Sequence, residues 1–416
     1  TCLFPQKKMN KIVLVITFSF IILCGFFTPP RMNTSAPTNE LLDSLLSNNK
    51  SLMDVWKNTD NHRLQIIYSR VTHDSFGNVQ LKNYTYNLSE DLYFYPASLV
   101  KLPVSIFALE KLKALSPDLD ITIDSKISIE SNYSCQSSVI SDDMSINSRP
   151  TLKNYISKAL IISDNDSYNR LYEFVGPEYC QKRLSEMGYG KAQIVTRFSR
   201  CNSVENMHTN AFNFYNEQGE VMYRQPPAFC DFMITPPLSN MKIGHSHFKH
   251  GKIIASPKDF ANHNCFPLQN MHDFLIGLIY PSVDRSPFLI DKKEREFILH
   301  SLSAKPNECS IKKIKNDTTF YDNYTNYLFY GAENKKPEND NLKIYNIVGQ
   351  SYGFLSDIAY FQNTENGIDF FLSAVLYTNS SEIVGDNIYE YETIGFPFLR
   401  DLGKIVYNYE LDQQLY

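Results

Sequence analysis

The pattern of apolar and polar positions predicts strands near both ends of the chain and helices through its middle. Apolar residues three and four positions apart indicate helices with a buried face, and they recur over the ranges 40–52, 96–115, 152–162, 166–174, 271–279, 291–303 and 395–409. Runs rich in Ile, Val, Tyr and Phe favour strands, and they cover 62–72, 80–88, 342–348, 355–362 and 368–378.

The order of these elements predicts an α+β fold. The strands from the two chain ends can join in one antiparallel sheet flanked by helices, and the helical middle then forms a second lobe without a knot. Residues 197–264, rich in Asn, His and Pro, fit neither pattern and are expected to form an irregular inserted excursion. We therefore expect one domain over residues 40–416, with a functional cleft between sheet and lobe.

The amino-terminal segment, residues 1–39, is predicted to direct export. Three lysines within residues 7–11 precede the apolar run 12–23, which is the layout of a secretory signal. The run ends at Cys24 in a sequence that resembles, imperfectly, a lipoprotein cleavage box. We expect a lipidated Cys24, with a cleaved signal or an uncleaved anchor as alternatives, and a tether over 27–39. Each alternative predicts an exported domain in the periplasm or cell envelope.

Charge narrows the range of partners. The 416 residues include 40 basic and 45 acidic side chains, which gives a net charge of −5. Nucleic acids and anionic lipids are bound by surfaces with a clear basic excess. We therefore expect no nucleic-acid partner, and membrane contact only through the amino-terminal anchor. An apolar content of 43% is typical of a globular protein.

Cysteine and histidine spacings predict no metal site. Apart from Cys2 and Cys24, six cysteines remain, which an exported protein can pair or bury as small apolar residues; they are Cys135, Cys180, Cys201, Cys230, Cys265 and Cys309. They contain no C-x-x-C spacing, so a zinc ribbon is disfavoured. Three histidines within residues 245–250 are interpreted as part of a solvated loop, because no cysteine or carboxylate pattern accompanies them.

The first candidate for chemistry is Ser98, at the predicted start of the 96–115 helix. Lys101 follows three positions later, so both side chains share one helix face. A lysine whose pKa is lowered by desolvation can act as the base for a serine nucleophile. Free N–H groups at a helix start can also hold an oxyanion. Taken alone, this spacing is equally typical of an ordinary helix start.

Two further motifs supply groups that fit the same chemistry. The hydroxyl of Ser163, between two predicted helices, could relay a proton, and the Asn165 amide could orient an acyl substrate. An interhelical capping turn is the alternative. Later, a strand ends in Ile347-Val348-Gly349, where Gly349 lets a substrate approach the strand edge and the Gln350 N–H is a second oxyanion donor. An ordinary hairpin is the alternative there.

Together, S-x-x-K at Ser98, S-D-N at Ser163 and the strand triplet at Ile347 resemble the serine β-lactamase and penicillin-binding protein superfamily. The closest resemblance is to the class A β-lactamase-type catalytic domain of exported bacterial serine hydrolases, over about residues 40–409. It implies a β-lactamase-like fold and no metal or organic cofactor. The implied substrate is a small-molecule β-lactam or a peptidoglycan peptide.

The resemblance also implies a role for each motif residue. Ser98 would be the acylated nucleophile, and Lys101 its general base or proton shuttle. Ser163 would pass a proton to the leaving nitrogen, and Asn165 would hold the acyl side chain of the substrate. The backbone N–H groups of Ser98 and Gln350 would form the oxyanion hole.

The sequence departs from the family pattern at two places. Ile347 stands where the family has a lysine, and Lys343, four residues earlier, lies about 13 Å away along a strand. Recognition of a substrate carboxylate is therefore in question. Class A enzymes deacylate with a glutamate-activated water, and Glu178, Glu186 and Glu205 are the candidates for that glutamate in this chain.

Three activities fit this reading of the sequence, and an esterase that acts on other acyl donors is a further alternative. The first is a class A-type β-lactamase that opens a strained amide through a Ser98 acyl-enzyme. The second is a D-Ala-D-Ala peptidase or transpeptidase that acts on peptidoglycan and hydrolyses its acyl-enzyme slowly. The third is a non-catalytic envelope-binding protein with the same fold, favoured by Ile347 but disfavoured by the Ser98–Lys101 pair.

Overall fold

The computed structural model describes residues 40–414, apart from 200, 232–234, 284–287 and 337–340. The predicted export segment, with Cys24, lies outside the described residues and stays a prediction. Among the helices of the described part, none is both long enough and apolar enough to cross a membrane.

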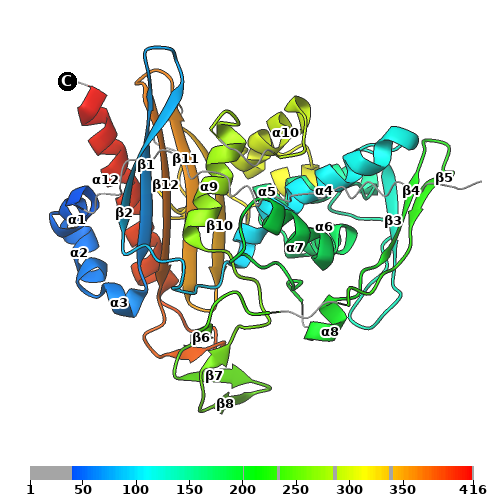
Figure 1. The fold of residues 1–416 in the computed structure, drawn as a ribbon, viewed down its shortest axis with the longest axis horizontal. Helices are drawn as coiled ribbons and strands as arrows, with labels where there is room; N and C mark the ends of the chain where they lie inside the picture. The colour runs from blue at the N-terminus through cyan, green and yellow to red at the C-terminus, as the bar shows by residue number, and fades with distance from the viewer. Residues whose placement is uncertain (1–39, 200, 232–234, 284–287, 337–340, 415–416) are drawn as a thin grey trace, which may run out of the picture. The chain divides into compact units, whose positions relative to one another are not determined.

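A five-stranded antiparallel sheet built from both ends of the chain is the centre of the fold (Figure 1). Its strands are β1 (Gln65–His73), β2 (Val79–Tyr86), β10 (Lys343–Ser351), β11 (Phe354–Asn363) and β12 (Ile368–Tyr377). Their order is β10-β11-β12-β1-β2, so the amino-terminal hairpin pairs with the last strand of the chain. β10 is an edge strand of this sheet.

Helices cover both faces of the sheet, which explains why its inner strands β11 and β12 are buried along nearly their whole length. Successive side chains of β12 divide between two cores. Phe370 packs with the carboxy-terminal helix α12 (Phe396–Gln414), whereas Phe371 packs toward α9 (Leu268–Ile279). Two more helices complete the α12 layer: α1 (Glu40–Ser47) and α2 (Lys50–Lys57).

The middle of the chain forms the predicted helical lobe. Its helices are α4 (Lys101–Leu115), α5 (Leu152–Ile161), α6 (Asn165–Val175), α7 (Pro177–Glu186) and α10 (Lys292–Ser303). α4 is buried on nearly all sides, because α5, α6 and α7 pack around it. Asp164 caps α6 by accepting a hydrogen bond from the Ser167 N–H at 2.7 Å. This cap fixes the S-D-N segment between α5 and α6.

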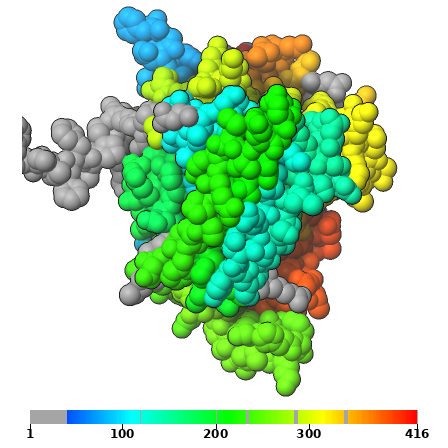
Figure 2. Space-filling view, turned by 90° about the vertical axis from the view of Figure 1, so that its right-hand side faces the viewer, coloured from blue at the N-terminus to red at the C-terminus, as the bar shows by residue number. Residues whose placement is uncertain are grey.

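Residues 197–264 contain a short helix and six short strands, where the sequence predicts irregular chain. They are α8 (Ser203–Asn206), β4 (Ala211–Tyr215), β5 (Val221–Gln225), β6 (Lys242–Ile243), β7 (Ser246–Lys249), β8 (Lys252–Ile254) and β9 (Lys258–Asp259). β4 and β5 join β3 (Lys126–Glu130) in a three-stranded sheet, and the segments carrying them lie side by side across one face in Figure 2. The histidine-rich stretch forms the protruding β7–β8 hairpin.

The α+β fold class is confirmed, and the differences concern short or polar elements. The pattern over 40–52 predicts one helix, but the structure has α1 and then α2. The sequence pattern does not predict α7, because this helix is mostly polar and buries few apolar side chains, among them Cys180 and Leu184. It also misses β3, whose five residues are too few to show a clear alternation.

Candidate active site

Ser98 lies on a 3₁₀ turn, Ala97–Val100, that leads directly into α4. The Leu99 N–H closes this turn by donating to the Pro96 carbonyl oxygen at 3.0 Å. Lys101 is the first residue of α4. The sequence places Ser98 at the start of a helix, and the structure refines this to the tighter turn that precedes it.

The side chain of Lys101 is completely buried and reaches the S-D-N segment. Its Nζ atom donates to Ser163 Oγ at 3.0 Å, to Asn165 Oδ1 at 2.8 Å, and to the Ser163 backbone carbonyl. The three N–H donors of an ammonium group therefore have three oxygen acceptors. Ser163 and Asn165, both singled out in the sequence, thus contact the amine of Lys101.

Burial lowers the pKa of Lys101 from its usual 10.5 to about 7, against the opposing effect of the Asp164 charge. A substantial fraction of the amine is therefore uncharged at neutral pH. Only the uncharged amine can take a proton from a hydroxyl group, so this environment prepares Lys101 to act as a base. The Phe198 ring, with its centroid 5.3 Å from Nζ, helps to cover the amine.

Three non-glycine residues at this centre hold the left-handed backbone conformation. They are Ala97 (φ 45°), Ser163 (φ 55°) and Tyr352 (φ 54°). Such conformations cost about 1–3 kcal/mol each and cluster at functional sites, where the surrounding structure imposes them. Ala97 directly precedes Ser98, Ser163 accepts a hydrogen bond from Lys101, and Tyr352 lies in the turn after β10.

Gln350 presents its backbone toward the turn that carries Ser98. The two-residue loop after β10 is closed by the pair Ser351–Phe354, so the next pair, Gln350–Leu355, is of the non-hydrogen-bonded kind. The N–H of Gln350 therefore points away from β11, off the edge where the Ser98 turn packs. A donor at this position fits the second half of an oxyanion hole.

Gly349 has a different role from the one expected of it. We expect it from the sequence to admit a substrate, but it is buried and lines neither of the cavities at Ser98. A Cβ atom there would lie 2.5 Å from the Pro96 carbonyl oxygen and 2.6 Å from Ser356 Oγ. The glycine instead lets β10 approach the Ser98 turn, so it acts on the site by positioning.

Two cavities meet at Ser98, and Asn165 and Gln350 line both of them. The first cavity, of about 350 Å³, is lined further by residues that include Tyr95, Thr196, Arg197, Phe198, Ser199, Cys201, His263 and Tyr352. The second, of about 320 Å³, is lined further by Ser163, Tyr321, Tyr324, Thr325, Tyr327, Ala332, Val348, Glu392 and Phe396. We call the second one the tyrosine cavity.

The aromatic wall of the first cavity is not predicted by the sequence. Tyr95 and Tyr352 meet edge to face, with ring centroids 5.1 Å apart, and His263 lies 6.2 Å from Tyr95. Burial lowers the pKa of His263 to about 4, so its imidazole is neutral at physiological pH. These residues come from distant segments in a chain rich in aromatic residues, and no local spacing marks them.

A protein-family model described as the "Beta-lactamase enzyme family" matches residues 69–225. The match contains Ser98, Lys101, Ser163 and Asn165, whose side chains the structure gathers around the Lys101 amine and the two cavities. Over these residues the chain is similar to the β-lactamase enzyme family. No curated protein sequence matches it.

Solved structures of β-lactamases align with most of this chain at low sequence identity and with TM-scores below 0.5. A β-lactamase from Desulfarculus baarsii DSM 2075 has 11% identity and a TM-score of 0.48, with 88% of this chain and 98% of that chain covered. A class A β-lactamase from Mycobacterium abscessus has 15% identity and a TM-score of 0.44, with 86% and 99% covered. An ancestral class A β-lactamase (GNCA) has 12% identity and a TM-score of 0.47, with 89% and 99% covered.

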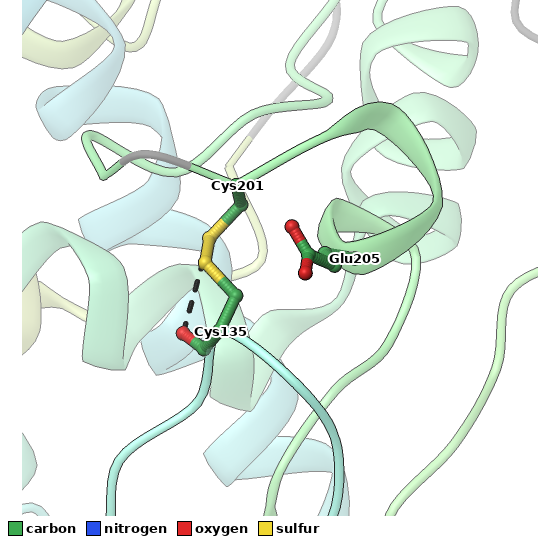
Figure 3. A group of neighbouring side chains, drawn as sticks. All are labelled: Cys135, Cys201 and Glu205. Atoms are coloured by element: carbon green, nitrogen blue, oxygen red, sulfur yellow. Dashed lines mark hydrogen bonds between the residues drawn. A yellow bond between two sulfur atoms is a disulfide. The ribbon is translucent and has the colours of Figure 1, made fainter.

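A disulfide bond lies at the first cavity. Cys135 is bonded to Cys201, which lines the cavity, and Glu205 lies beside the bond (Figure 3). Because both sulfur atoms are in the disulfide, these three residues do not form a metal site, and no other such cluster occurs among the described residues. The remaining described cysteines are buried thiols: Cys180, Cys230, Cys265 and Cys309.

Neither Ile347 nor Lys343 supplies the charge of the family lysine at the site. Ile347 is 2% exposed and packs in the core, away from both cavities. Lys343 lies at the far end of β10, with its Nζ atom 4.9 Å from the ring centroid of Tyr345. Neither residue can therefore meet a substrate carboxylate near Ser98.

None of the three candidate glutamates for deacylation lies at the site. Glu178 and Glu186 are on α7, and Glu205 accepts hydrogen bonds from Ser134 and from the Asn202 N–H. None of them lines either cavity. Among the described residues that line the first cavity, none carries a carboxylate.

Proposed function

We propose that the protein is a serine hydrolase of the class A β-lactamase type, which opens an amide such as a β-lactam through an acyl-enzyme on Ser98. The contact of the buried Lys101 amine with Ser163 and Asn165 carries this proposal. A lysine with a pKa of about 7 beside a serine in a cleft is the arrangement that proton transfer requires. A protein that only binds a ligand has no need of it.

In the acylation step, Ser98 Oγ attacks the carbonyl carbon while its proton passes to the uncharged Lys101 amine. The oxygen of the carbonyl becomes negatively charged and accepts hydrogen bonds from the N–H groups of Ser98 and Gln350. Asn165 Oδ1 accepts a hydrogen bond from Lys101 Nζ, which leaves the Asn165 NH₂ group to donate to the substrate's acyl side chain.

The tetrahedral intermediate then collapses with cleavage of the carbon–nitrogen bond. Ser163 Oγ gives its proton to the leaving nitrogen, and the ammonium of Lys101, 3.0 Å away, restores that proton to Ser163. Lys101 is then uncharged again. Attack of water on the Ser98 ester, with transfer of a proton from water to the leaving serine oxygen, completes hydrolysis.

A second candidate is a D-Ala-D-Ala peptidase or transpeptidase that acts on peptidoglycan. The lack of a carboxylate among the described residues lining the first cavity favours it, because no glutamate is placed there to activate the deacylating water. Its acyl-enzyme would persist for much longer than that of an efficient β-lactamase.

Intact-protein mass spectrometry tests both candidates. The protein is mixed with a penicillin and, separately, with a monocyclic β-lactam that carries no charged group. A stoichiometric adduct that is absent in Ser98→Ala and retained in the control Ser303→Ala is expected with at least one of them. The decay rate of the adduct separates rapid hydrolysis from a persistent acyl-enzyme. If neither probe gives a Ser98-dependent adduct, the envelope-binding alternative replaces the hydrolase.

We also propose that the domain works outside the cytoplasm, attached through Cys24 or released from its signal. The Cys135–Cys201 bond supports this, since disulfides persist in oxidising compartments. Mass analysis of the amino-terminal peptide after expression in a bacterium tests the lipidation of Cys24.

A further inference from the structure

The tyrosine cavity is the side of Ser98 on which the leaving group of a substrate would lie. Ser163, the proposed proton donor to the leaving nitrogen, lines the tyrosine cavity and is not among the residues that line the first cavity. A group bonded to that nitrogen must therefore enter the tyrosine cavity. The chemistry of its walls then selects the leaving group.

Aromatic rings and one carboxylate form these walls. Tyr321 and Tyr324 meet nearly at right angles, with ring centroids 5.7 Å apart. The Tyr321 hydroxyl donates to the Ala332 carbonyl oxygen at 2.5 Å, and the Tyr327 hydroxyl donates to Gln350 Oε1 at 3.3 Å. Glu392 adds a carboxylate that forms no ion pair with another described residue.

The tyrosine wall is held rigidly against the sheet. The buried carboxylate of Asp357 accepts hydrogen bonds from the N–H groups of Tyr327 at 3.1 Å and Leu328 at 2.8 Å. Asn346, on the neighbouring strand β10, donates to the Thr325 carbonyl oxygen at 2.8 Å and to Asp357 at 2.9 Å. The cavity therefore has a preformed shape, which favours selective binding.

Cations near this cavity are already engaged by other groups. Lys101 donates to oxygens of Ser163 and Asn165. Arg400 pairs with Glu333 at 2.6 Å and with Asp401 at 2.7 Å. No lysine or arginine is among the described residues that line the cavity. An anionic leaving group would thus meet the Glu392 carboxylate without a compensating charge.

We propose that the substrate of Ser98 carries a positively charged group on its leaving side, and that Glu392 and the tyrosine rings recognise it. This inference rests on the proposed function of Ser98. A cation over aromatic faces and near a carboxylate gains from both contacts, whereas a carboxylate is repelled. This site therefore selects a positively charged leaving group, whereas the strand lysine of the family binds a negatively charged substrate carboxylate.

Three aryl esters of one N-acylglycine test this preference. Their leaving phenols carry a trimethylammonium, a carboxamide or a carboxylate group in the meta position. The second-order rate of phenol release should be about three- to ten-fold higher for the cationic than for the neutral ester, and lowest for the anionic one. Glu392→Gln should reduce that ratio, and Glu392→Lys should invert the order. Glu296→Gln, at an exposed carboxylate on α10 outside the cavity, should leave it unchanged.

Binding to Ser98→Ala separates failure of this inference from failure of the proposed function. Calorimetric titration with the cationic and anionic phenols requires no acyl chemistry. Tighter binding of the cation, weakened in Ser98→Ala/Glu392→Gln, supports the preference even if no ester acylates Ser98. Equal or tighter binding of the anion, or an anionic ester that reacts fastest, overturns it, even if acylation of Ser98 is demonstrated.

Discussion

Lys101 Nζ and Asn165 Oδ1 lie 2.8 Å apart, and this contact joins the start of α4 to the start of α6. An amide oxygen accepts a hydrogen bond from an amine without adding a negative charge. Burial therefore dominates the electrostatics, and the pKa of Lys101 falls to about 7. Asparagine at this position therefore accepts a hydrogen bond from the amine without raising the pKa of Lys101 as a carboxylate would.

Acylation of Ser98 should therefore accelerate as the pH rises through about 7. Below this pH Lys101 is protonated and cannot accept the Ser98 proton; above it, the uncharged amine predominates. Stopped-flow acylation rates between pH 5 and 9 should follow a single rising limb. Lys101→Met, which keeps the length of the side chain, should lower the rate about a hundred- to ten-thousand-fold and remove the limb. A pH-independent wild-type rate would contradict the role of Lys101.

Asn165→Asp should move this limb to higher pH. The substitution keeps the shape of the side chain but places a carboxylate at the position of the amide oxygen, 2.8 Å from Nζ. A neighbouring negative charge raises a lysine pKa by about 1–3 units. The same pH series on the variant measures the shift. A loss of rate at every pH with an unchanged midpoint would mean that another group titrates in the limb.

Restoring the family lysine should not restore recognition of a substrate carboxylate. Ile347 is 2% exposed in the core, so Ile347→Lys buries an unpaired charge and should lower the free energy of unfolding by about 3 kcal/mol or more. Ile347→Val, which only removes a methylene group, should cost about 1 kcal/mol. Urea unfolding compares the two variants. A stable Ile347→Lys protein that gained acylation by penicillin would contradict this placement of the side chain.

Two parts of the candidate site follow from sequence, because each depends on local geometry. The three-residue spacing of Ser98 and Lys101 fixes their relation within one turn, and the polar break at Ser163 marks a capped junction between helices. The need for a glycine at position 349 cannot be predicted in this way. The atom that leaves no room for a side chain there is the Pro96 carbonyl oxygen, which is distant in the sequence.

The two cavities could not be predicted for the same reason. The tyrosine wall depends on hydrogen bonds that the backbone N–H groups of Tyr327 and Leu328 donate to the Asp357 carboxylate. The aromatic wall depends on the contact of Tyr95 with Tyr352. In a chain with 27 tyrosines and 28 phenylalanines, no local pattern distinguishes these residues from core residues. The strands of the sheet, in contrast, are marked by local runs rich in β-branched and aromatic residues, so the sheet is predictable.

Reduction of the Cys135–Cys201 disulfide should destabilise the protein and loosen the first cavity. The bond closes a loop between residues 66 positions apart, for which the chain-entropy relation gives about 4 kcal/mol. Cys135→Ser/Cys201→Ser should reproduce the loss of stability without any reductant. Thermal unfolding with and without dithiothreitol measures it, and the double variant should be insensitive to dithiothreitol. A protein whose melting temperature is unchanged by both treatments would show that the bond does not stabilise the native state.

A buried histidine should make the protein sensitive to mild acid. His272 lies in the core, where its Nε2 atom is 2.8 Å from Ser69 Oγ and its Nδ1 atom 2.7 Å from Ser373 Oγ. Burial lowers its pKa to about 3 in the folded protein, whereas the unfolded chain takes up a proton near pH 6.5. Between these values the unfolded state binds the extra proton, so stability is full above pH 6.5 and falls as the pH drops toward 3.

Comparison with His272→Gln isolates this effect from the other titrating groups. The glutamine keeps a polar side chain but has no proton to gain. Between pH 7 and pH 5, the wild-type protein should lose about 2 kcal/mol more of its free energy of unfolding than the variant loses, whatever the variant's stability at neutral pH. Urea titrations at the two pH values measure both differences. Equal losses in the two proteins would mean that the His272 pKa is not lowered in the folded state, and that Ser69 and Ser373 can accommodate the protonated ring.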